Sequence, residues 1–439
     1  MDGLREKVGE EVELIYEPGC GYVDTQVFRS EFDSERFSYK GKKGLQAEYF
    51  SNPRLEGAPV VVRMESDINF QHGDGESFAS GIAANQMSIR YTAEYCPENS
   101  EEVSLFLSGD DGYKLYVDNQ LCIDSGKGQT YYTFSATGGK SYKVVIEYWK
   151  YTDISELKFD VGHLWNADPK ETARAVKDAD VILFAGGISA SLEGESMKVF
   201  AEGFKGGDRE TISLPHVQTA LLKELAATGK PVILVMLTGS AIAVEWEAEN
   251  LPAILNAWYP GQAGGLAIAD VLFGDYNPAG RLPVTFYKSE KDLPDFEDYS
   301  MDNRTYRYFK GEVRYPFGYG LSYSAFSYNN LKIEKATGGY KVSVNVKNIG
   351  GVDGDEVVQL YVSSEKTSFR VPLRSLKGFR RIHLKKGETK NVSFLLPEKE
   401  LQVIDRGGYS IPMKGTIQIS VGGGQPGSGV SHQTDTINR

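Results

Sequence analysis

Two glutamates separated by one glycine, Glu193 and Glu195, lie in a long glycine-rich loop at residues 186–209. The loop follows an apolar run at residues 179–185, which has the composition of a buried strand. In parallel α/β sheets, ligands bind beyond the carboxyl ends of the strands. Carboxylates at such an end are candidates for general acid and base catalysis, and the alternative is a solvated acidic loop.

Other catalytic motifs have weaker support. The loop at 186–209 lacks the GxGxxG pattern of dinucleotide binding, and no GxxxxGK[ST] phosphate-binding motif occurs in the chain. No GxSxG motif occurs that would form a nucleophile elbow, and the turn Thr238-Gly239-Ser240 lacks the second glycine. The sequence therefore argues against a nucleotide-dependent enzyme and against a serine hydrolase.

Metal and disulfide chemistry is also weakly supported. The three cysteines, Cys20, Cys96 and Cys122, are far apart and form no CxxC pair, and the five histidines are scattered. Asp110 and Asp111 are adjacent on an expected turn, where they could bind calcium together with carbonyl ligands. The alternative is an acidic turn whose carboxylates fix local hydrogen bonds. We therefore expect no cofactor and no metal site, with calcium at this aspartate pair as the open exception.

The elements that must position the two glutamates lie in a central block at residues 167–290. Apolar runs at 179–185, 231–237 and 253–258 predict buried strands, and a stretch rich in small residues at 261–274 predicts a helix. A further helix is indicated by apolar residues at helical spacing, which are Leu214, Val217, Leu221, Leu222 and Leu225. The alternation of strands and helices predicts an α/β sandwich with a mainly parallel sheet.

All-β patterns flank this block on both sides. Alternation of apolar and polar residues predicts strands with one buried face. The alternating segments lie at residues 103–107, 113–117, 142–148, 340–346, 358–362 and 417–421. Residues 11–16 form a lone strand candidate near the start of the chain. The glycine- and serine-rich tail from Gly422 has the composition of a disordered segment.

Composition excludes several classes of partner. The 439 residues carry 48 Lys and Arg against 60 Asp and Glu, for a net charge of −12. No basic block occurs, so nucleic acid is not an expected partner. No apolar run approaches the roughly 18–20 residues of a membrane helix, and the first residues do not form a signal peptide. The 26 tyrosines suit sugar stacking, although strand-rich proteins are rich in tyrosine in any case.

Six strings of residues in and just after the central block resemble the C-terminal sandwich domain of glycoside hydrolase family 3, the family of β-glucosidases and β-xylosidases. They occupy residues 192–195, 206–209, 258–265, 269–283, 304–309 and 315–323, in the family's order. Residues 44–50 and 110–118 resemble an anthrax protective-antigen-type β-domain, which some members carry as an insertion. The last strands resemble the fibronectin type III-like domain that ends many members.

The resemblance implies three domains, one of them divided. The α/β sandwich comprises residues 1–40 and 164–326, and the inserted protective-antigen-type β-domain comprises 41–163. A fibronectin type III-like β-sandwich follows at 327–422, and 423–439 remain as a tail. The lone strand candidate near the start then becomes the first strand of the sandwich domain, separated from the others by the insertion.

The resemblance also implies a retaining glycosidase, which uses two carboxyl groups about 5–5.5 Å apart. Family members carry the nucleophilic aspartate on an N-terminal (β/α)8 barrel. A barrel needs about 250 residues, so we expect it to be absent from this chain. The match of the Glu-Gly pair to the family's acid/base loop makes Glu193 the first choice of acid/base and Glu195 the alternative.

Neighbours of these glutamates receive roles from the same resemblance. Met197, Phe200 and Phe204 would supply apolar cover to the acid. Asp208 and Arg209 would brace the loop through a charge-assisted pair. The implied partners are a β-linked oligosaccharide or glycoside and a separate barrel domain, and the implied compartment is periplasmic or extracellular.

The expected function is that of the C-terminal portion of an exo-acting β-glucosidase or β-xylosidase, inactive without the barrel. The competing class is a non-catalytic carbohydrate-binding or adhesion protein, because the protective-antigen-type domain alone would support it. A structural fragment of a longer enzyme is the third interpretation.

Overall fold

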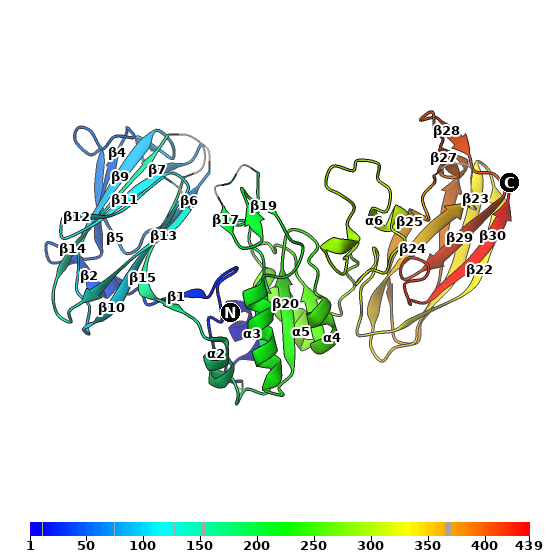
Figure 1. Cartoon of the computed structure of the whole chain (residues 1–439), viewed down its shortest axis with the longest axis horizontal. Coiled ribbons are helices and arrows are strands. Elements are labelled where there is room, and N and C mark those ends of the chain that lie inside the picture. Colours follow the sequence, from blue (N-terminus) through cyan, green and yellow to red (C-terminus); the bar gives the residue numbers. More distant parts are fainter. Residues whose placement is uncertain are drawn as a thin grey trace. The chain divides into compact units, whose positions relative to one another are not determined.

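The computed structural model describes residues 1–10, 12–73, 75–126, 128–151, 155–195, 197, 199–364 and 370–439, and for Phe200 only the backbone. The chain divides into two compact units (Figure 1). Unit 1 comprises Met1–Glu17, Tyr22–Asp24 and Pro169–Arg439, and unit 2 comprises Pro18–Gly21 and Thr25–Asp168. Unit 2 therefore begins upstream of position 41, the boundary expected from the sequence.

Unit 2 consists of antiparallel strands in two main sheets. One sheet has the order β1 (Gln26–Ser30), β15 (Ser155–Asn166), β10 (Glu101–Gly109) and β13 (Gly128–Ala136), and β6 (Asn69–His72) also pairs with β15. The other has the order β12 (Gln120–Ser125), β11 (Gly112–Val117), β14 (Tyr142–Lys150), β9 (Met87–Tyr95), β2 (Phe37–Tyr39) and β3 (Lys42–Lys43). On this second sheet β4 (Leu45–Phe50) pairs with β9 and with β5 (Val61–Glu65), and β7 (Ser77–Ala79) and β8 (Ile82–Ala83) form a separate hairpin.

The core of unit 2 draws on both sheets. The alternating segments at 103–107, 113–117 and 142–148 are confirmed as parts of β10, β11 and β14. Because side chains of a strand point alternately to its two faces, every second residue of these segments enters one core. Leu105 and Ile146 are completely buried there.

The parallel sheet of unit 1 has the order β16 (Ile182–Gly187), β20 (Val232–Leu237) and β21 (Ala253–Asn256). Its three strands confirm the runs predicted from the sequence. The predicted helix is α3 (His216–Ala227), whose residues Leu221 and Leu222 are fully buried. Figure 1 shows α3 beside β20, and the helix contacts both β16 and β20.

The remaining helices and short strands lie mostly in this part of unit 1. They are α1 (Asp2–Val8), α2 (Pro169–Ala175), α4 (Glu245–Asn250), α5 (Gly264–Phe273), α6 (Thr305–Tyr308), β17 (Phe200–Ala201), β18 (Phe204–Lys205), β19 (Asp208–Arg209), η1 (Ser34–Arg36, in unit 2), η2 (Glu290–Asp292) and η3 (Glu398–Glu400, in the C-terminal part). The helix α5 confirms the prediction at 261–274. Helices α1 and α5 approach closely at Gly3, where a Cβ atom would lie 2.4 Å from the carbonyl carbon of Gly265. No described helix is long and apolar enough to cross a membrane.

The C-terminal β-domain contains two main sheets. One has the order β22 (Phe326–Ala336), β23 (Gly339–Asn348) and β26 (Thr389–Pro397), and the other has β25 (Ser375–Leu384), β24 (Gly354–Ser364), β29 (Thr416–Gly422) and β30 (His432–Asn438). A hairpin of β27 (Gln402–Ile404) and β28 (Ser410–Pro412) adjoins them. Val344, Leu360 and Ile419, from three of the strands predicted by alternation, are buried in the common core.

Two sequence predictions are wrong. The described residues 12–16 of the predicted first strand form no strand, and Val12, Ile15 and Tyr16 are about half exposed, so no neighbouring strand buries them. Residue 11 lies outside the described part. The tail is ordered as well, because β30 pairs with β29 along its whole length. Its glycines serve packing: a Cβ on Gly423 would lie 2.5 Å from Oε1 of Glu356.

A buried ion pair joins the segment after α5 to the C-terminal β-domain. Arg281 donates a 2.7 Å hydrogen bond to Glu356, and their side chains are only 9% and 3% exposed. Tyr328 donates a second hydrogen bond of 2.6 Å to the same carboxylate. Burial raises the pKa of Glu356, and the positive charge of Arg281 opposes this shift. The pair therefore places two desolvated charges that depend on each other inside the protein.

We predict that Glu356→Gln lowers the free energy of unfolding by about 3 kcal/mol, because it leaves the buried Arg281 charge uncompensated. Urea denaturation at neutral pH measures the loss. Asp355→Asn is the matched control, since the partners of Asp355, Arg381 and His383, are about half exposed; its expected cost is below about 1 kcal/mol. Equal costs for the two variants would contradict a special role for the buried pair.

Candidate active site at the carboxyl edge of the parallel sheet

Three loops leave the same edge of the parallel sheet. In the strand register Gly187 lies opposite Leu237, and Met236 lies opposite Asn256, so β16, β20 and β21 end side by side. The chain continues from these ends into the loop with Glu193, the turn with Ser240 and the segment with Tyr259. This is the edge at which α/β sheets bind ligands.

The Glu193 carboxylate is held by donors from the other two loops. The hydroxyl of Tyr259 donates to Oε1 over 2.8 Å, and the hydroxyl of Ser240 donates to Oε2 over 3.3 Å. Sequence reasoning did not identify either donor. Their signal was their position directly after two predicted strands.

Close packing around this carboxylate requires a glycine in the β20 turn. A Cβ atom at position 239 would lie 2.6 Å from Oε1 of Glu193 and 2.6 Å from the ring of Tyr259. Nearby, Trp258 adopts a left-handed backbone conformation with φ of 54°, which is rare for a large side chain. The missing side chain of Gly239 and the left-handed backbone of Trp258 therefore let the β20 turn and the Trp258–Tyr259 segment meet at Glu193.

Arg209 holds the β20 turn through two hydrogen bonds. Its Nη1 donates to the Ser240 hydroxyl over 2.7 Å and to the Ala241 carbonyl over 3.0 Å. Because the Ser240 oxygen accepts from Arg209, its own hydrogen is free to point at Glu193. Burial lowers the pKa of Arg209, and the negative charges of Glu193 and Glu290 oppose that shift.

The predicted pairing of Asp208 with Arg209 is not what the structure shows. Asp208 is exposed, whereas the guanidinium of Arg209 bonds to the β20 turn and, through Nε, to the carbonyl of Thr211. Adjacent residues of the short strand β19 point their side chains to opposite faces, which separates the two charges. Arg209 does brace the site, but through Ser240.

Tyr259 is suited to remain a donor. Burial and the hydrogen bond to Glu193 both raise the pKa of its phenol well above the usual value. The phenol therefore keeps its proton across the neutral range. Glu193 consequently has two fixed hydroxyl donors, one at each oxygen.

The loop that carries Glu193 folds back on the β18–β19 turn. The amide of Gly194 donates to the Gly207 carbonyl over 3.1 Å, and the amide of Met197 donates to the Gly206 carbonyl over 3.0 Å. Met197 also packs against Gly194, where a Cβ would lie 2.7 Å from the Met197 sulfur. Phe204 is buried. The third residue predicted as apolar cover, Phe200, has a side chain outside the described part.

The remaining sequence candidates have other surroundings. Glu195 is exposed, and the described residues give it no hydrogen-bond partner. Asp110 accepts hydrogen bonds from Tyr148 and from the Glu156 amide, each at 2.8 Å, and forms an ion pair with Lys150. The Lys150 ammonium also lies 3.6 Å from Asp111. A cation of the protein itself thus lies at the aspartate pair considered for calcium.

Gln218 ties the start of the Glu193 loop to the segment that joins the two units. Its Oε1 accepts from the Gly187 amide, and its Nε2 donates to the carbonyls of Gly187 and Tyr22, all at 2.7 Å. The side chain is only 2% exposed. Sequence reasoning missed this residue, because a single glutamine within an apolar helix pattern carries no local signal.

We predict that Gln218→Met lowers the free energy of unfolding by about 2–4 kcal/mol, because it leaves the buried amide and carbonyl of Gly187 without partners. Urea denaturation measures the loss, and amide exchange at Gly187 accelerates if the loop start loosens. Gln418→Met, on an exposed position of β29, is the control and costs under about 0.5 kcal/mol. Unchanged exchange at Gly187 would contradict the clamp.

A second carboxylate, Glu290, holds the segment between β19 and α3. It accepts hydrogen bonds from the Thr211 hydroxyl, from the Ile212 amide at 2.8 Å and from the Ser213 hydroxyl at 3.2 Å. Burial alone would raise its pKa, but these hydrogen bonds outweigh burial and lower the pKa to about 2. The folded protein therefore stabilises the charged form of Glu290.

We predict a pH-dependent effect of Glu290→Gln. A carboxyl with a depressed pKa contributes stability above its unfolded value near 4.5, and the contribution is lost as pH falls toward about 2. The variant should be less stable than the parent by about 1–2 kcal/mol at neutral pH, and this gap should close in acid. Thermal denaturation of both proteins along a pH series measures the gap, and a constant gap would refute the prediction.

Two family models and several known proteins match this chain. The model of the glycosyl hydrolase family 3 C-terminal domain matches residues 2–323, and that of the fibronectin type III-like domain matches residues 356–425. A xylan 1,4-beta-xylosidase of Xylanibacter ruminicola is 38% identical over 412 residues, which are 92% of this chain and 47% of the relative. A periplasmic beta-glucosidase of Salmonella typhimurium is 38% identical over 241 residues, 51% of this chain and 30% of the relative.

Solved structures show the same likeness. A beta-glucosidase from Kluyveromyces marxianus, solved with glucose, superposes on the whole chain with a TM-score of 0.73 and 25% identity, and the match covers 55% of that protein. The chain thus spans about half the length, or less, of the relatives it matches. Since the family model covers most of the chain, this protein belongs to glycosyl hydrolase family 3, of which it contains the C-terminal domain.

Proposed function

We propose that this chain supplies the acid/base to a retaining, exo-acting β-glucosidase or β-xylosidase, and that Glu193 is that residue. The observation that carries the proposal is the Glu193 carboxylate, held by Tyr259 and Ser240 at the carboxyl edge of the sheet. The relatives named as xylosidase and glucosidase support the substrate class. The nucleophile would be a carboxylate of the barrel that the family resemblance implies.

The chemistry follows from a two-step displacement. In the first step the nucleophile attacks the anomeric carbon while Glu193, protonated, gives its proton to the departing glycosidic oxygen. In the second step Glu193, now a carboxylate, takes a proton from water, and the resulting oxygen nucleophile displaces the enzyme carboxylate. The proton taken from water restores the acid form of Glu193, so the cycle is balanced and consumes one water.

The geometry favours one oxygen of Glu193 for the proton. Oε1 accepts a strong hydrogen bond of 2.8 Å from Tyr259, whereas the contact of Oε2 with Ser240 is longer, at 3.3 Å. Oε2 is therefore the better position for the transferable proton. Arg209, which donates to Ser240, keeps that hydroxyl in place while the charge of Glu193 changes during the cycle.

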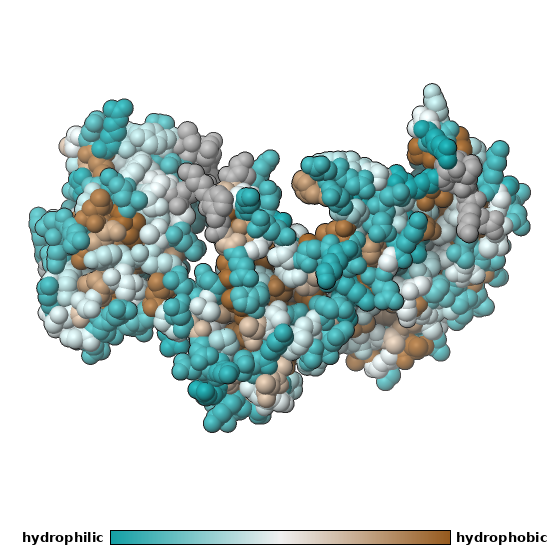
Figure 2. Space-filling model, viewed as in Figure 1, coloured by the Kyte–Doolittle hydropathy of each residue, from teal (hydrophilic) through white to brown (hydrophobic). Residues whose placement is uncertain are grey.

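An exposed apolar surface supports the proposal of a further domain. Of the ten residues of α5, only Ala269 is buried, while Leu266 and Phe273 are 38% and 49% exposed. Figure 2 shows apolar surface on the part of unit 1 that contains β20 and α5. A helix that is apolar on most sides is normally covered by other protein. A barrel domain packed here would provide that cover and bring its nucleophile to this part of the enzyme.

We also propose that unit 2 is the protective-antigen-type β-domain and a substrate-contacting module. The two antiparallel sheets and their shared core support this assignment. The ion pair of Asp110 with Lys150 favours a structural role for the aspartates over calcium-dependent adhesion. Titration of the chain with oligosaccharides, with and without calcium, tests the competing class: calcium-dependent binding would favour adhesion.

We predict that Glu193→Gln, made in this chain joined to a family 3 barrel, slows hydrolysis according to the leaving group. Glycosides with poor leaving groups need the proton and should slow by about 10²–10⁴-fold. Dinitrophenyl glycosides leave without a proton and should slow far less in their first step. Steady-state and burst kinetics on both substrates measure the difference.

Glu195→Gln in the same enzyme is the matched control, because that side chain is exposed two residues away. It should retain near-parental rates on both substrates. Equal slowing of good and poor leaving groups by Glu193→Gln, or a larger loss from Glu195→Gln, would reject Glu193 as the acid.

A further inference from the structure

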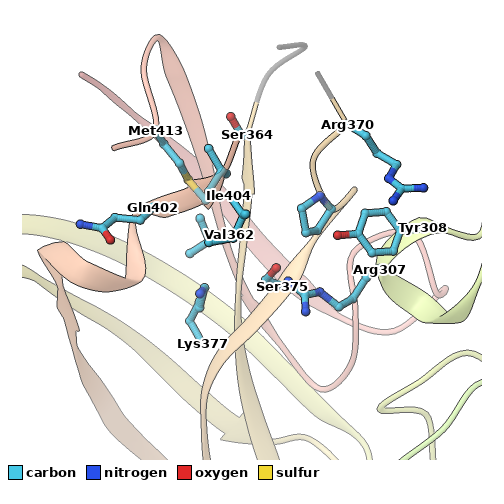
Figure 3. Close-up of a pocket in the computed structure, with 12 residues that line it drawn as sticks. Arg307, Tyr308, Val362, Ser364, Arg370, Ser375, Lys377, Gln402, Ile404 and Met413 are labelled. Atoms are coloured by element: carbon cyan, nitrogen blue, oxygen red, sulfur yellow. The ribbon is translucent and has the colours of Figure 1, made fainter. Parts of the chain in front are cut away.

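A small cavity of about 100 Å³ lies where α6 meets the strands β24, β25 and β27 (Figure 3). Arg307, Arg370 and Lys377, from three segments, place cationic side chains around it. Figure 3 shows Arg307 and Arg370 on the same side as Tyr308, with Lys377 on the opposite side beyond Val362. The cavity uses none of the residues that surround Glu193.

The charges around the cavity do not balance within the described residues. Arg370 pairs with Asp302 at 3.1 Å, and Lys377 pairs with Glu400 at 3.0 Å. The described residues give the guanidinium of Arg307 no carboxylate partner, and its carbon lies 5.9 Å from the centroid of the Tyr308 ring. Among the described residues, the positive charge of Arg307 therefore remains available to an anion.

Polar and apolar groups line the cavity in addition to the charges. The hydroxyl of Ser364 is buried and has no hydrogen-bond partner among the described residues, which is costly unless something binds it. Ser375 and Gln402 add further polar groups. The Tyr308 ring and the side chain of Ile404 form apolar wall.

Contacts between α6 and the segment that leads into β25 border the cavity. The amide of Leu373 donates to the Arg307 carbonyl over 2.7 Å, and the hydroxyl of Tyr306 accepts from the Leu376 amide over 3.2 Å. The Tyr306 ring stacks on Phe317 with centroids 4.1 Å apart. Helix α6 is therefore fixed on β25, and the backbone from which the exposed Arg307 side chain extends is held in place.

We propose that this cavity binds the carboxylate of a sugar acid, a uronate. The unpaired Arg307 supplies the planar donor pair that recognises a carboxylate. Ser364, Ser375 and Gln402 offer hydrogen bonds to ring hydroxyls, and the Tyr308 ring offers an apolar face to the C–H groups of a pyranose. An inorganic oxyanion would use the cations but would leave the apolar wall without contact.

Calorimetric or NMR titration of the full chain with D-glucuronate, D-glucose and sulfate tests the proposal. Glucuronate should bind with millimolar affinity, at least about tenfold more tightly than glucose, because only the acid engages Arg307. Arg307→Met should weaken glucuronate binding at least about tenfold. Arg380→Met is the matched control, because Arg380 is an exposed arginine on β25 that lies outside the cavity. This variant should leave glucuronate binding unchanged.

A second variant separates binding from folding. Ser364→Ala removes an unsatisfied buried hydroxyl, so it should weaken glucuronate binding without lowering the midpoint of thermal denaturation. Equal binding of glucose and glucuronate, or equal losses from Arg307→Met and Arg380→Met, would overturn the site. Binding of sulfate as tight as that of glucuronate would overturn the sugar-acid assignment.

Discussion

The parallel register of three short strands is the constraint on which the candidate active site depends. Because β16, β20 and β21 end at the same level, three loops far apart in the sequence meet at one edge. Glu193 and its two hydroxyl donors, Tyr259 and Ser240, each lie in a segment that follows one of these strands. A shift of one strand by one residue would move its loop by about 3.3 Å, more than a hydrogen bond tolerates.

Buried polar side chains, rather than apolar packing alone, fix how the modules of unit 1 connect to this edge. Gln218 occupies both backbone groups of Gly187, and Arg281 reaches Glu356 across the join with the C-terminal β-domain. Apolar contacts tolerate sliding, whereas a buried donor or acceptor has one satisfactory position. Such groups add little net stability, but they restrict the positions that the connected segments can take. That combination suits a site whose loops must hold one carboxylate in place.

Local pattern predicted most of the fold because most of its elements have a local cause. The apolar runs of the parallel sheet and the helical spacing of α3 are visible within windows of six to twelve residues, and each became the expected element. Residues 12–16 have strand-like composition but no partner strand among the described residues, and a strand exists only by pairing. The prediction of a disordered tail was wrong for the opposite reason. The glycines of the tail give it the composition of a disordered segment, although they are needed for close contact with Glu356 and Gly318.

The candidate site could be predicted only in part, for a related reason. Glu193 stood out as a carboxylate in a glycine-rich loop after a strand, and family resemblance ranked it above Glu195. Neither clue could name Tyr259 or Ser240, because their role arises from two other strand ends meeting the first.

The arrangement also constrains what the rest of the enzyme must provide on the proposed assignment. Tyr259 and Ser240 approach Glu193 from the other two loop segments, and Gly239 packs against it with no room for a side chain. The acid is thus positioned by the chain itself before any other domain docks. A docking domain then needs to set only the distance between two carboxyl groups, for which the retaining mechanism requires about 5–5.5 Å. Dividing the task in this way places the tight hydrogen-bond geometry within one folded unit, where the strand register maintains it, and leaves the interface with a single spacing to satisfy.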